Sequence, residues 1–216
     1  MINGVVTVLI TPLNKDGTIS VESLEKLINY QINNGVGAFW ALGSTGEEIN
    51  LSRKVRLEYV EILSSLVKKR VPVIMGTGEL SIKENLNFYH HCLKNEIDFV
   101  SYIHRDTKQG AKEYCECVRK IESKSPLPIF LYNNVQRGKE IDYQSVSKLA
   151  TLPNIVGVKY GARNHMPFIQ ASSLNSKNFQ VFSAGNFFFS AMCYGCKAST
   201  TSDANFFLNV YKKIKY

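Results

Sequence analysis

The sequence has no apolar run near the ~20 residues that a membrane-spanning helix needs, so we expect no membrane partner. Its opening, Met1-Ile2-Asn3-Gly4, lacks the basic and apolar regions of a signal peptide. The five cysteines are odd in number and scattered, and Cys193-x-x-Cys196 has no second pair at matching spacing. Such a set argues for reduced thiols and against a disulfide framework, a redox site or a metal site. These absences predict a cytoplasmic protein.

The charge balance is basic, with 26 Lys and Arg against 18 Asp and Glu and a formal net charge of +8. A nucleic-acid site would show a basic run interleaved with aromatic residues, and the sequence has none. We therefore expect no nucleic-acid partner, and only a mild attraction for anionic substrates. A hydrophobic content of 44% is ordinary for a globular protein, and 216 residues fit one domain with a substantial core.

Short apolar runs recur along the chain, and a helical pattern follows each of them. The runs are mostly continuous rather than alternating, which is typical of parallel strands covered on both faces. The last run is only weakly apolar. The eight predicted strands are Val5–Thr11, Ala38–Ala41, Val73–Gly76, Phe99–Tyr102, Ile129–Tyr132, Ile155–Lys159, Val181–Ser183 and Ala198–Thr201.

The segments between the runs predict helices. In residues 82–93, for example, apolar side chains recur at steps of three and four residues. Ser20, Ser52 and Ser81 stand where caps of the first three helices are expected. Eight strand–helix units without a break in composition predict an α/β fold, a single (β/α)8 TIM barrel over residues 1–216. A doubly wound open sheet is the alternative, but no Gly-x-Gly-x-x-Gly follows the first run.

The sixth run carries the sharpest functional signal because it ends in Lys159. The active site of a barrel lies at the carboxyl ends of its strands. Lysine is rare at the end of a buried strand unless it is paired or used, and an apolar environment makes an amine nucleophilic. We therefore predict that Lys159 is a nucleophile. The alternative is a lysine that extends to the rim and pairs with a carboxylate.

Two other predicted strands also end in polar residues. Gly43-Ser44-Thr45-Gly46-Glu47 follows the second run, and its hydroxyls and amides suit a bound carboxylate. The same residues equally suit a turn that caps the next helix. Tyr132 ends the fifth run and can relay a proton, and Arg137 can bind a carboxylate through two hydrogen bonds. A ring packed at the rim and an ordinary surface arginine are the alternatives for these two.

Taken together, these motifs resemble the dihydrodipicolinate synthase and N-acetylneuraminate lyase family of pyruvate-dependent barrels. The resemblance extends over essentially the whole chain. It rests on four segments in the right order at barrel spacing, namely Thr7–Leu13, Gly43–Glu47, Leu131–Asn133 and Val156–Lys159.

The resemblance implies a lyase of the Schiff-base aldolase type that needs no metal and no organic cofactor. Its substrates would be pyruvate, which condenses with Lys159, and an aldehyde, which the resulting enamine attacks. Tyr132 matches the family's proton-relay tyrosine. Ser44 and Thr45 match the hydroxyl pair that binds the pyruvyl carboxylate and assists the relay.

Three further residues are assigned to substrate binding under this resemblance. Gly43 accompanies the hydroxyl pair in its turn. Arg137 matches, by its distance from the tyrosine, the arginine that holds the carboxylate of the aldehyde in the synthase branch. Thr200, in the last predicted strand, is also assigned to the substrate.

The sequence departs from the family pattern in three places. Ile103 stands where the synthase branch has a second relay tyrosine, with Tyr102 and His104 on either side. Val135 replaces the usual proline of the turn after the fifth strand. The chain ends at Tyr216, without the C-terminal helical segment that supports tetramers in the family, so we expect a homo-oligomer whose assembly is disturbed.

Arg137 favours the condensation of pyruvate with aspartate semialdehyde, and this synthase reaction is the prediction. The Ser44-Thr45 pair, in place of two threonines, and Ile103 favour an N-acetylneuraminate lyase or a 2-keto-3-deoxy sugar acid aldolase. A truncated, non-catalytic barrel is the alternative from a different class of protein.

Overall fold

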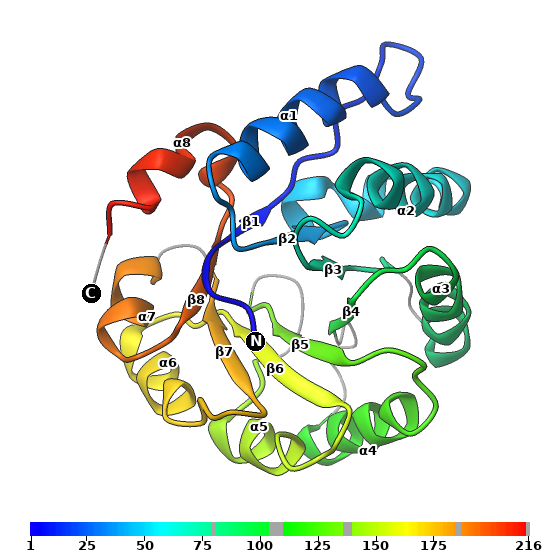
Figure 1. The fold of residues 1–216 in the computed structure, drawn as a ribbon. Helices are drawn as coiled ribbons and strands as arrows, with labels where there is room; N and C mark the ends of the chain where they lie inside the picture. The colour runs from blue at the N-terminus through cyan, green and yellow to red at the C-terminus, as the bar shows by residue number, and fades with distance from the viewer. Residues whose placement is uncertain (79–80, 104–109, 136–139, 185–186, 215–216) are drawn as a thin grey trace.

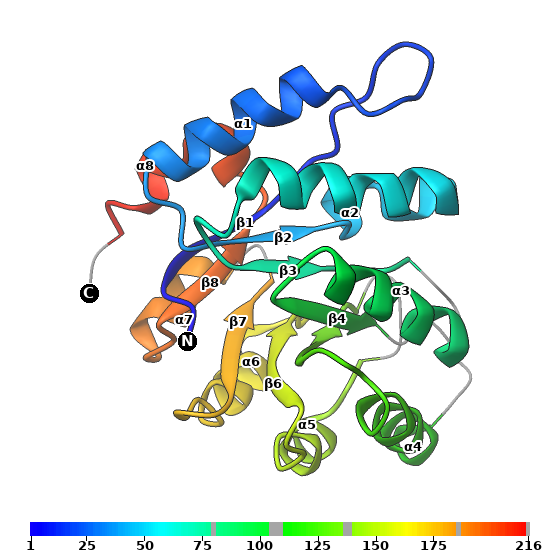
Figure 2. The ribbon, with the colours of Figure 1, turned by 45° about the vertical axis from the view of Figure 1, so that its right-hand side comes forward.

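Eight parallel strands form a nearly closed barrel, and helices surround it (Figures 1 and 2). The computed structural model describes residues 1–78, 81–103, 110–135, 140–184 and 187–214. The strands are β1 (Gly4–Val8), β2 (Ala38–Ala41), β3 (Val73–Met75), β4 (Phe99–Ile103), β5 (Ile129–Asn133), β6 (Ile155–Tyr160), β7 (Gln180–Ser183) and β8 (Ala198–Thr201). The helices are α1 (Val21–Asn33), α2 (Arg53–Val67), α3 (Ile82–Lys94), α4 (Ala111–Glu122), α5 (Tyr143–Leu149), α6 (His165–Ser172), α7 (Phe188–Cys193) and α8 (Ala204–Tyr211). Two turns of 3₁₀-helix, η1 (Ser44–Gly46) and η2 (Glu48–Asn50), follow β2.

The predicted (β/α)8 barrel is confirmed, since the strands pair in the order β7-β6-β5-β4-β3-β2-β1-β8. The main difference in bounds concerns β1, which ends at Val8 rather than at Thr11. Beyond that point the N–H of Ile10 donates to the side chain of Asn205 on α8, at 3.3 Å. Pro12 has no N–H to offer to a neighbouring strand. The N–H of Leu9 still donates to the carbonyl of Trp40 on β2 at 3.0 Å, so the run leaves the sheet only at Ile10.

Side chains close the barrel between β7 and β8. Among the residues that the structure describes, these strands share one isolated bridge, Ala184 with Thr200, instead of a ladder. The Thr200 hydroxyl donates to the carbonyl of Ser183 at 2.5 Å, and the hydroxyl of Ser199 accepts from the N–H of Ser183 at 3.0 Å. Hydroxyls thus satisfy backbone groups that a ladder would otherwise pair, which explains why this run is so weakly apolar.

The apolar core has two layers. One lies inside the barrel, where Trp40, Phe130 and Phe182 are fully buried or nearly so. The rings of Phe130 and Phe182 stack with their centroids 5.0 Å apart. The other layer lies between the strands and the surrounding helices. No helix in the described ranges is long and apolar enough to cross a membrane.

The outer helices are fixed by caps and by polar contacts between neighbours. Ser52 and Ser81 accept hydrogen bonds from backbone N–H groups three residues on, as predicted. Ser20 stands at the N-cap position of α1, as predicted, but its side chain makes no capping hydrogen bond within the described residues: its ψ is 89°, and its hydroxyl donates to Ser23.

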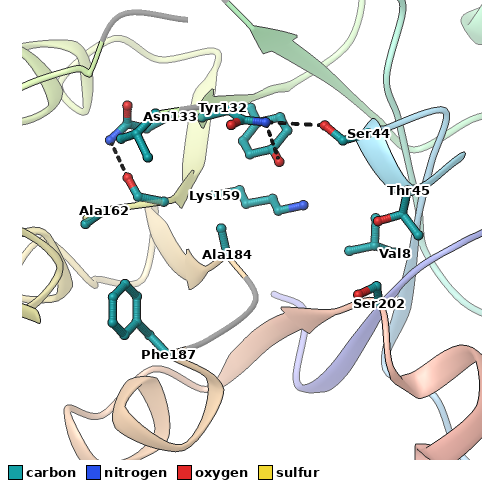
Figure 3. A pocket seen from close by; sticks show the side chains of 13 residues that line it. Val8, Ser44, Thr45, Tyr132, Asn133, Lys159, Ala162, Ala184, Phe187 and Ser202 are labelled. Carbon is teal, nitrogen blue, oxygen red and sulfur yellow. Dashed lines mark hydrogen bonds between the residues drawn. The ribbon is translucent and has the colours of Figure 1, made fainter. Parts of the chain in front are cut away.

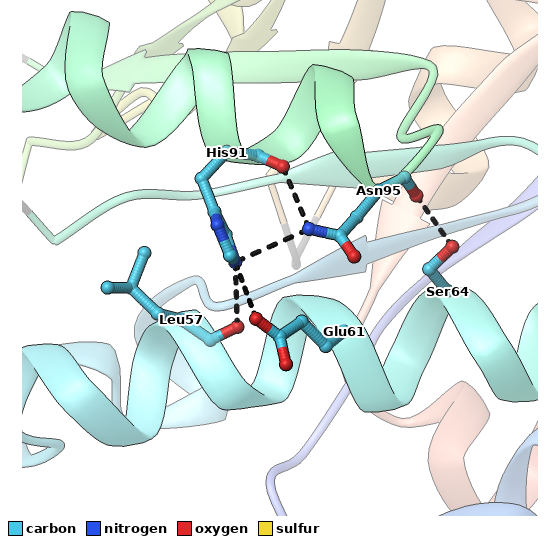
Figure 4. A network of polar contacts seen from close by, with 5 residues as sticks. All are labelled: Leu57, Glu61, Ser64, His91 and Asn95. Atoms are coloured by element: carbon cyan, nitrogen blue, oxygen red, sulfur yellow. Dashed lines mark hydrogen bonds and ion pairs between the residues drawn. The ribbon is translucent and has the colours of Figure 1, made fainter.

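Between α2 and α3 the ring of His91 contacts three groups (Figure 4). Its Nε2 lies 3.1 Å from the carbonyl of Leu57, 3.5 Å from the carboxylate of Glu61 and 3.4 Å from the amide of Asn95. The hydroxyl of Ser64 donates to the carbonyl of Asn95 at 2.6 Å. These contacts link α2 to α3 and to the residue that ends it.

Gly157 on β6 is a position where the barrel leaves no room for a side chain. A methyl group there would lie 2.4 Å from the carbonyl oxygen of Gln180 and 2.4 Å from the ring of Phe130. Since one of these neighbours is backbone, we expect Gly157→Ala to destabilise the fold by about 1–3 kcal/mol, the usual cost of overpacking. Thermal denaturation measures the effect. Gly43→Ala is the matched control, because the nearest atoms to its methyl would belong to the side chains of Trp40 and Val8, at 3.3 Å or more, and its melting temperature should fall far less.

Candidate active site

A cavity of about 270 Å³ lies where the carboxyl ends of the strands meet (Figure 3). Its walls come from the ends of six strands or from the residues that follow them. The lining residues are Val8, Ser44, Thr45, Tyr132, Asn133, Asn134, Val135, Lys159, Gly161, Ala162, Ala184, Phe187 and Ser202. The structure thus brings together four of the predicted site residues, Lys159, Tyr132, Ser44 and Thr45.

Lys159 enters the cavity from β6 and is 4% exposed. It is in register with Tyr132 on β5 and with Phe182 on β7, so the three side chains share the inner face of the barrel. The Nζ atom lies 4.4 Å from the ring centroid of Tyr132 and 5.0 Å from that of Trp40. Lys159 forms no ion pair with a carboxylate in the described part of the chain. The paired-lysine alternative is therefore not what the structure shows.

Asn134 connects the tyrosine to the hydroxyl turn after β2. Its Nδ2 atom donates to the hydroxyl of Tyr132 at 3.0 Å and to the hydroxyl of Ser44 at 3.3 Å (Figure 3). Each hydroxyl accepts a hydrogen bond from the amide and keeps its own proton free to donate. Both hydroxyls can therefore give protons to a molecule bound in the cavity.

The neighbouring Asn133 is fully buried and fixes the end of β5. Its Nδ2 atom donates to the carbonyl of Gly161 at 2.9 Å, and its Oδ1 atom accepts from the N–H of Ile141 at 2.9 Å. The side chain thus joins the ends of β5 and β6 to the segment before α5. Tyr132 directly precedes Asn133, and Lys159 lies two residues before Gly161, so Asn133 helps to set their relative positions.

The turn that carries Ser44 and Thr45 is η1, and it is bracketed by left-handed backbone. Leu42 has a φ of 48° and Glu47 a φ of 53°, which are costly values for residues other than glycine. The hydroxyl of Thr11 donates to the carbonyl of Gly46 at 2.8 Å and holds the turn against the end of β1. The two hydroxyls at the cavity therefore stand on a tightly constrained turn.

The structure places two other predicted residues, Gly43 and Thr200, outside this cavity. Gly43 lies against the indole of Trp40 and does not line it. Thr200 is fully buried, and its hydroxyl takes part in closing the barrel between β7 and β8. Arg137 lies outside the described residues.

Ile103 ends β4 directly beside Tyr132, on the inner side of the barrel. Tyr102 belongs to the layer between strands and helices, where burial raises the pKa of its phenol above the ordinary value. The two side chains thus lie on opposite faces of β4, as the alternation along a strand predicts. His104, the other residue that could replace a relay hydroxyl, lies outside the described residues.

Tyr160 follows Lys159 but takes no part in the cavity. Its hydroxyl donates to the carbonyl of Ile141 at 2.8 Å. Burial, with a further contribution from the carboxylates of Glu140 and Asp142, raises the pKa of Tyr160 to about 12. This phenol therefore stays protonated at neutral pH, and its ring packs in the layer between the strands and the helices.

The arrangement brings a primary amine, a phenol and two hydroxyls to one small cavity. Such groups can form a Schiff base with a keto acid and move protons to and from it. No group of three or more His, Cys, Asp or Glu side chains among the described residues could hold a metal ion. Asn134 and Phe187 were not predicted as cavity residues, because an amide in a turn and an apolar ring are both ordinary features of a sequence.

Comparison with known proteins places these features in one family. The model of the dihydrodipicolinate synthetase family matches residues 1–215. The 4-hydroxy-tetrahydrodipicolinate synthase of Buchnera aphidicola subsp. Baizongia pistaciae is 30% identical over 188 residues, which are 85% of this chain and 63% of that protein. The enzyme of the same name from Syntrophus aciditrophicus is 33% identical over 193 residues, which are 87% of this chain and 65% of that protein.

Solved structures agree with the sequence relatives. The dihydrodipicolinate synthase of Bacteroides thetaiotaomicron superposes with a TM-score of 0.92 at 27% identity, over 97% of this chain and 72% of that chain. That of Aquifex aeolicus gives a TM-score of 0.90 at 25% identity, over 98% and 73%. This chain spans just under two thirds of the length of the curated relatives named above.

Proposed function

Because this chain belongs to the dihydrodipicolinate synthetase family, we propose that it is a pyruvate-dependent Schiff-base lyase whose nucleophile is Lys159. The observation that carries the proposal is the buried amine of Lys159 beside the phenol of Tyr132 and the hydroxyls of Ser44 and Thr45. The preferred reaction is the condensation of pyruvate with aspartate semialdehyde, as in a dihydrodipicolinate synthase.

The reaction would begin when the amine of Lys159 attacks the keto carbon of pyruvate and a water molecule leaves. Loss of a methyl proton then gives an enamine, whose carbon attacks the aldehyde and forms the new carbon–carbon bond. Tyr132 would carry protons to and from the nitrogen and the methyl carbon. The hydroxyls of Ser44 and Thr45 would bind the pyruvyl carboxylate at the opposite wall of the cavity (Figure 3).

The exchange of pyruvate methyl hydrogens in D₂O, followed by NMR, tests the first half of this proposal, because it needs the amine and the relay but no aldehyde. A turnover screen with pyruvate and several aldehydes tests the second half. Exchange without any turnover of aspartate semialdehyde, together with turnover of a polyhydroxylated aldehyde, would favour a sugar acid aldolase instead. No exchange would favour a non-catalytic barrel.

Arg137 is proposed as the residue that holds the carboxylate of the aldehyde. We expect Arg137→Ala to raise the KM for aspartate semialdehyde by roughly 10–100-fold, since a charge-assisted pair of hydrogen bonds is lost. Pyruvate methyl exchange should continue at the native rate. Steady-state kinetics and the exchange assay separate the two effects. If exchange itself collapsed, Arg137 would belong to the keto acid site.

The remaining proposals concern the protein as a whole. We propose that residues 1–216 form one barrel domain, that the protein is cytoplasmic and that it forms a homo-oligomer. Phe187 and Phe188 are buried, whereas Phe189, Phe206 and Phe207 are 60–67% exposed on the last two helices. Exposed apolar groups of this kind favour association, which sedimentation velocity would measure.

A further inference from the structure

A second, smaller cavity adjoins the first and shares two of its walls, Ser44 and Tyr132. It encloses about 10 Å³, close to the smallest space that holds one water molecule. Its lining is mixed, with polar side chains from β2, η2, β4 and the segment after β3. The lining residues are Trp40, Leu42, Gly43, Ser44, Glu48, Gly76, Thr77, Gly78, Ser101, Ile103 and Tyr132.

The indole of Trp40 gives this cavity a hydrogen-bond donor. Trp40 is fully buried, and its Nε1 atom has no hydrogen-bond partner in the part of the chain that the structure describes. A methyl group on Gly43 would lie 3.4 Å from Nε1, and both residues line the second cavity but not the first. A buried N–H without an acceptor costs free energy of folding, so we expect an acceptor in the adjoining space.

Glu48 gives the same cavity a proton acceptor. It is 3% exposed, and its backbone carbonyl accepts a hydrogen bond from Nη1 of Arg56 at 3.2 Å. A methyl group on Gly78 would lie 3.3 Å from Cγ of Glu48 and 3.4 Å from Cδ of Arg56. Both side chains therefore pack against Gly78, and of the two Glu48 lines the second cavity together with Tyr132.

The residue beside Tyr132 on β4 cannot carry a proton onward. Ile103 lies beside Tyr132 in the barrel and has no group that gives or accepts a proton. Tyr102 faces the helices. A water molecule in the second cavity would have a donor in Trp40 and acceptors in Glu48 and the Tyr132 hydroxyl, which matches the two to four polar partners that buried waters have.

We propose that the second cavity binds one water molecule, and that this water and Glu48 form the proton path that leads away from Tyr132. The inference rests on the proposed function. When Tyr132 gives up its phenol proton, the water accepts it and passes one of its own protons to the Glu48 carboxylate. When Tyr132 is reprotonated, the same steps run in reverse. Glu48 is thus a positioning and relay residue that does not touch the substrate.

The test separates Schiff-base formation from proton transfer. In Glu48→Gln we expect pyruvate methyl exchange in D₂O to slow by about tenfold or more, because the amide no longer accepts the proton. Borohydride trapping of pyruvate on Lys159 should continue at the native rate, because it needs only the amine. Glu58→Gln, an exposed carboxylate on α2, is the control and should change neither rate.

A second variant covers the case in which Glu48→Gln folds poorly. Trp40→Phe keeps one aromatic ring in the barrel and removes the indole N–H together with the rest of the second ring. It should slow exchange several-fold while trapping persists, since the water loses its donor but not its acceptors. A crystal structure should show a water oxygen about 3 Å from Nε1 of Trp40.

Three outcomes would overturn the inference. One is exchange at the native rate in a folded Glu48→Gln protein. Another is the loss of trapping and exchange together at an unchanged melting temperature, which would make Glu48 part of the lysine site. The third is a well-ordered crystal structure with no density in the second cavity. If the native protein traps no pyruvate, the proposed function itself fails, and the relay with it.

Discussion

Replacing Lys159 by alanine should abolish the covalent capture of pyruvate. Sodium borohydride reduces a Schiff base to a stable amine, so the native protein should gain a pyruvyl mass on the peptide that contains residue 159. In Lys159→Ala that mass should be absent, because Lys159 is the one primary amine among the described residues that line the cavity. Turnover should fall by about 10⁴–10⁶-fold, the size seen when a covalent nucleophile is removed.

The structure explains why this variant should keep its fold. The amine points into the cavity and lies over two aromatic rings, and its loss removes no ion pair in the described part of the chain. Lys120→Ala, on the exposed face of α4, is the control and should be labelled like the native protein. Labelling that persists in Lys159→Ala would assign the nucleophile to a different residue.

The sequence was sufficient for the barrel and for the residues that end its strands. Continuous apolar runs predict buried parallel strands, and the carboxyl ends of such strands converge. Lys159 and Tyr132 could therefore be placed together from the sequence alone. The register between β5 and β6 places the two residues directly side by side. The strand predicted over Ala198–Thr201 is also confirmed, although this run is only weakly apolar. Its hydroxyls bind backbone groups of β7, and composition alone does not reveal such contacts.

What the sequence did not reveal depends on contacts between distant segments. Asn134 bridges Tyr132 to Ser44 across 90 residues of chain, and an asparagine in a turn carries no sign of such a role. Thr200 looked like a substrate ligand at a strand end, whereas its hydroxyl is bound to the carbonyl of Ser183. Glu48 resembles any acidic residue near the start of a helix until its burial is known. Side-chain direction and burial decide these three cases, and neither follows from local sequence.

Tyr132→Phe should leave the fold intact and slow the reaction by roughly 10²–10⁴-fold, the usual contribution of a positioned acid–base group. The phenyl ring would keep its contacts with Trp40, whose centroid lies 5.8 Å away, and with the amine of Lys159. Only the hydroxyl that accepts from Asn134 would be lost. Steady-state rates and pyruvate methyl exchange should fall together, because both need the same proton carrier.

Tyr102→Phe provides the matched control for this prediction, since it removes a phenol hydroxyl from the neighbouring strand on the opposite face. Its rates should equal those of the native protein. Comparing the two variants also shows which phenol carries protons in a site where Ile103 supplies no hydroxyl. If Tyr102→Phe were slow and Tyr132→Phe were fast, the proton carrier would reach the substrate from β4, and the path through the second cavity would lose its starting point. If only Tyr132→Phe is slow, protons enter and leave through the phenol that Asn134 holds, and Ile103 replaces a hydroxyl that this protein does not need.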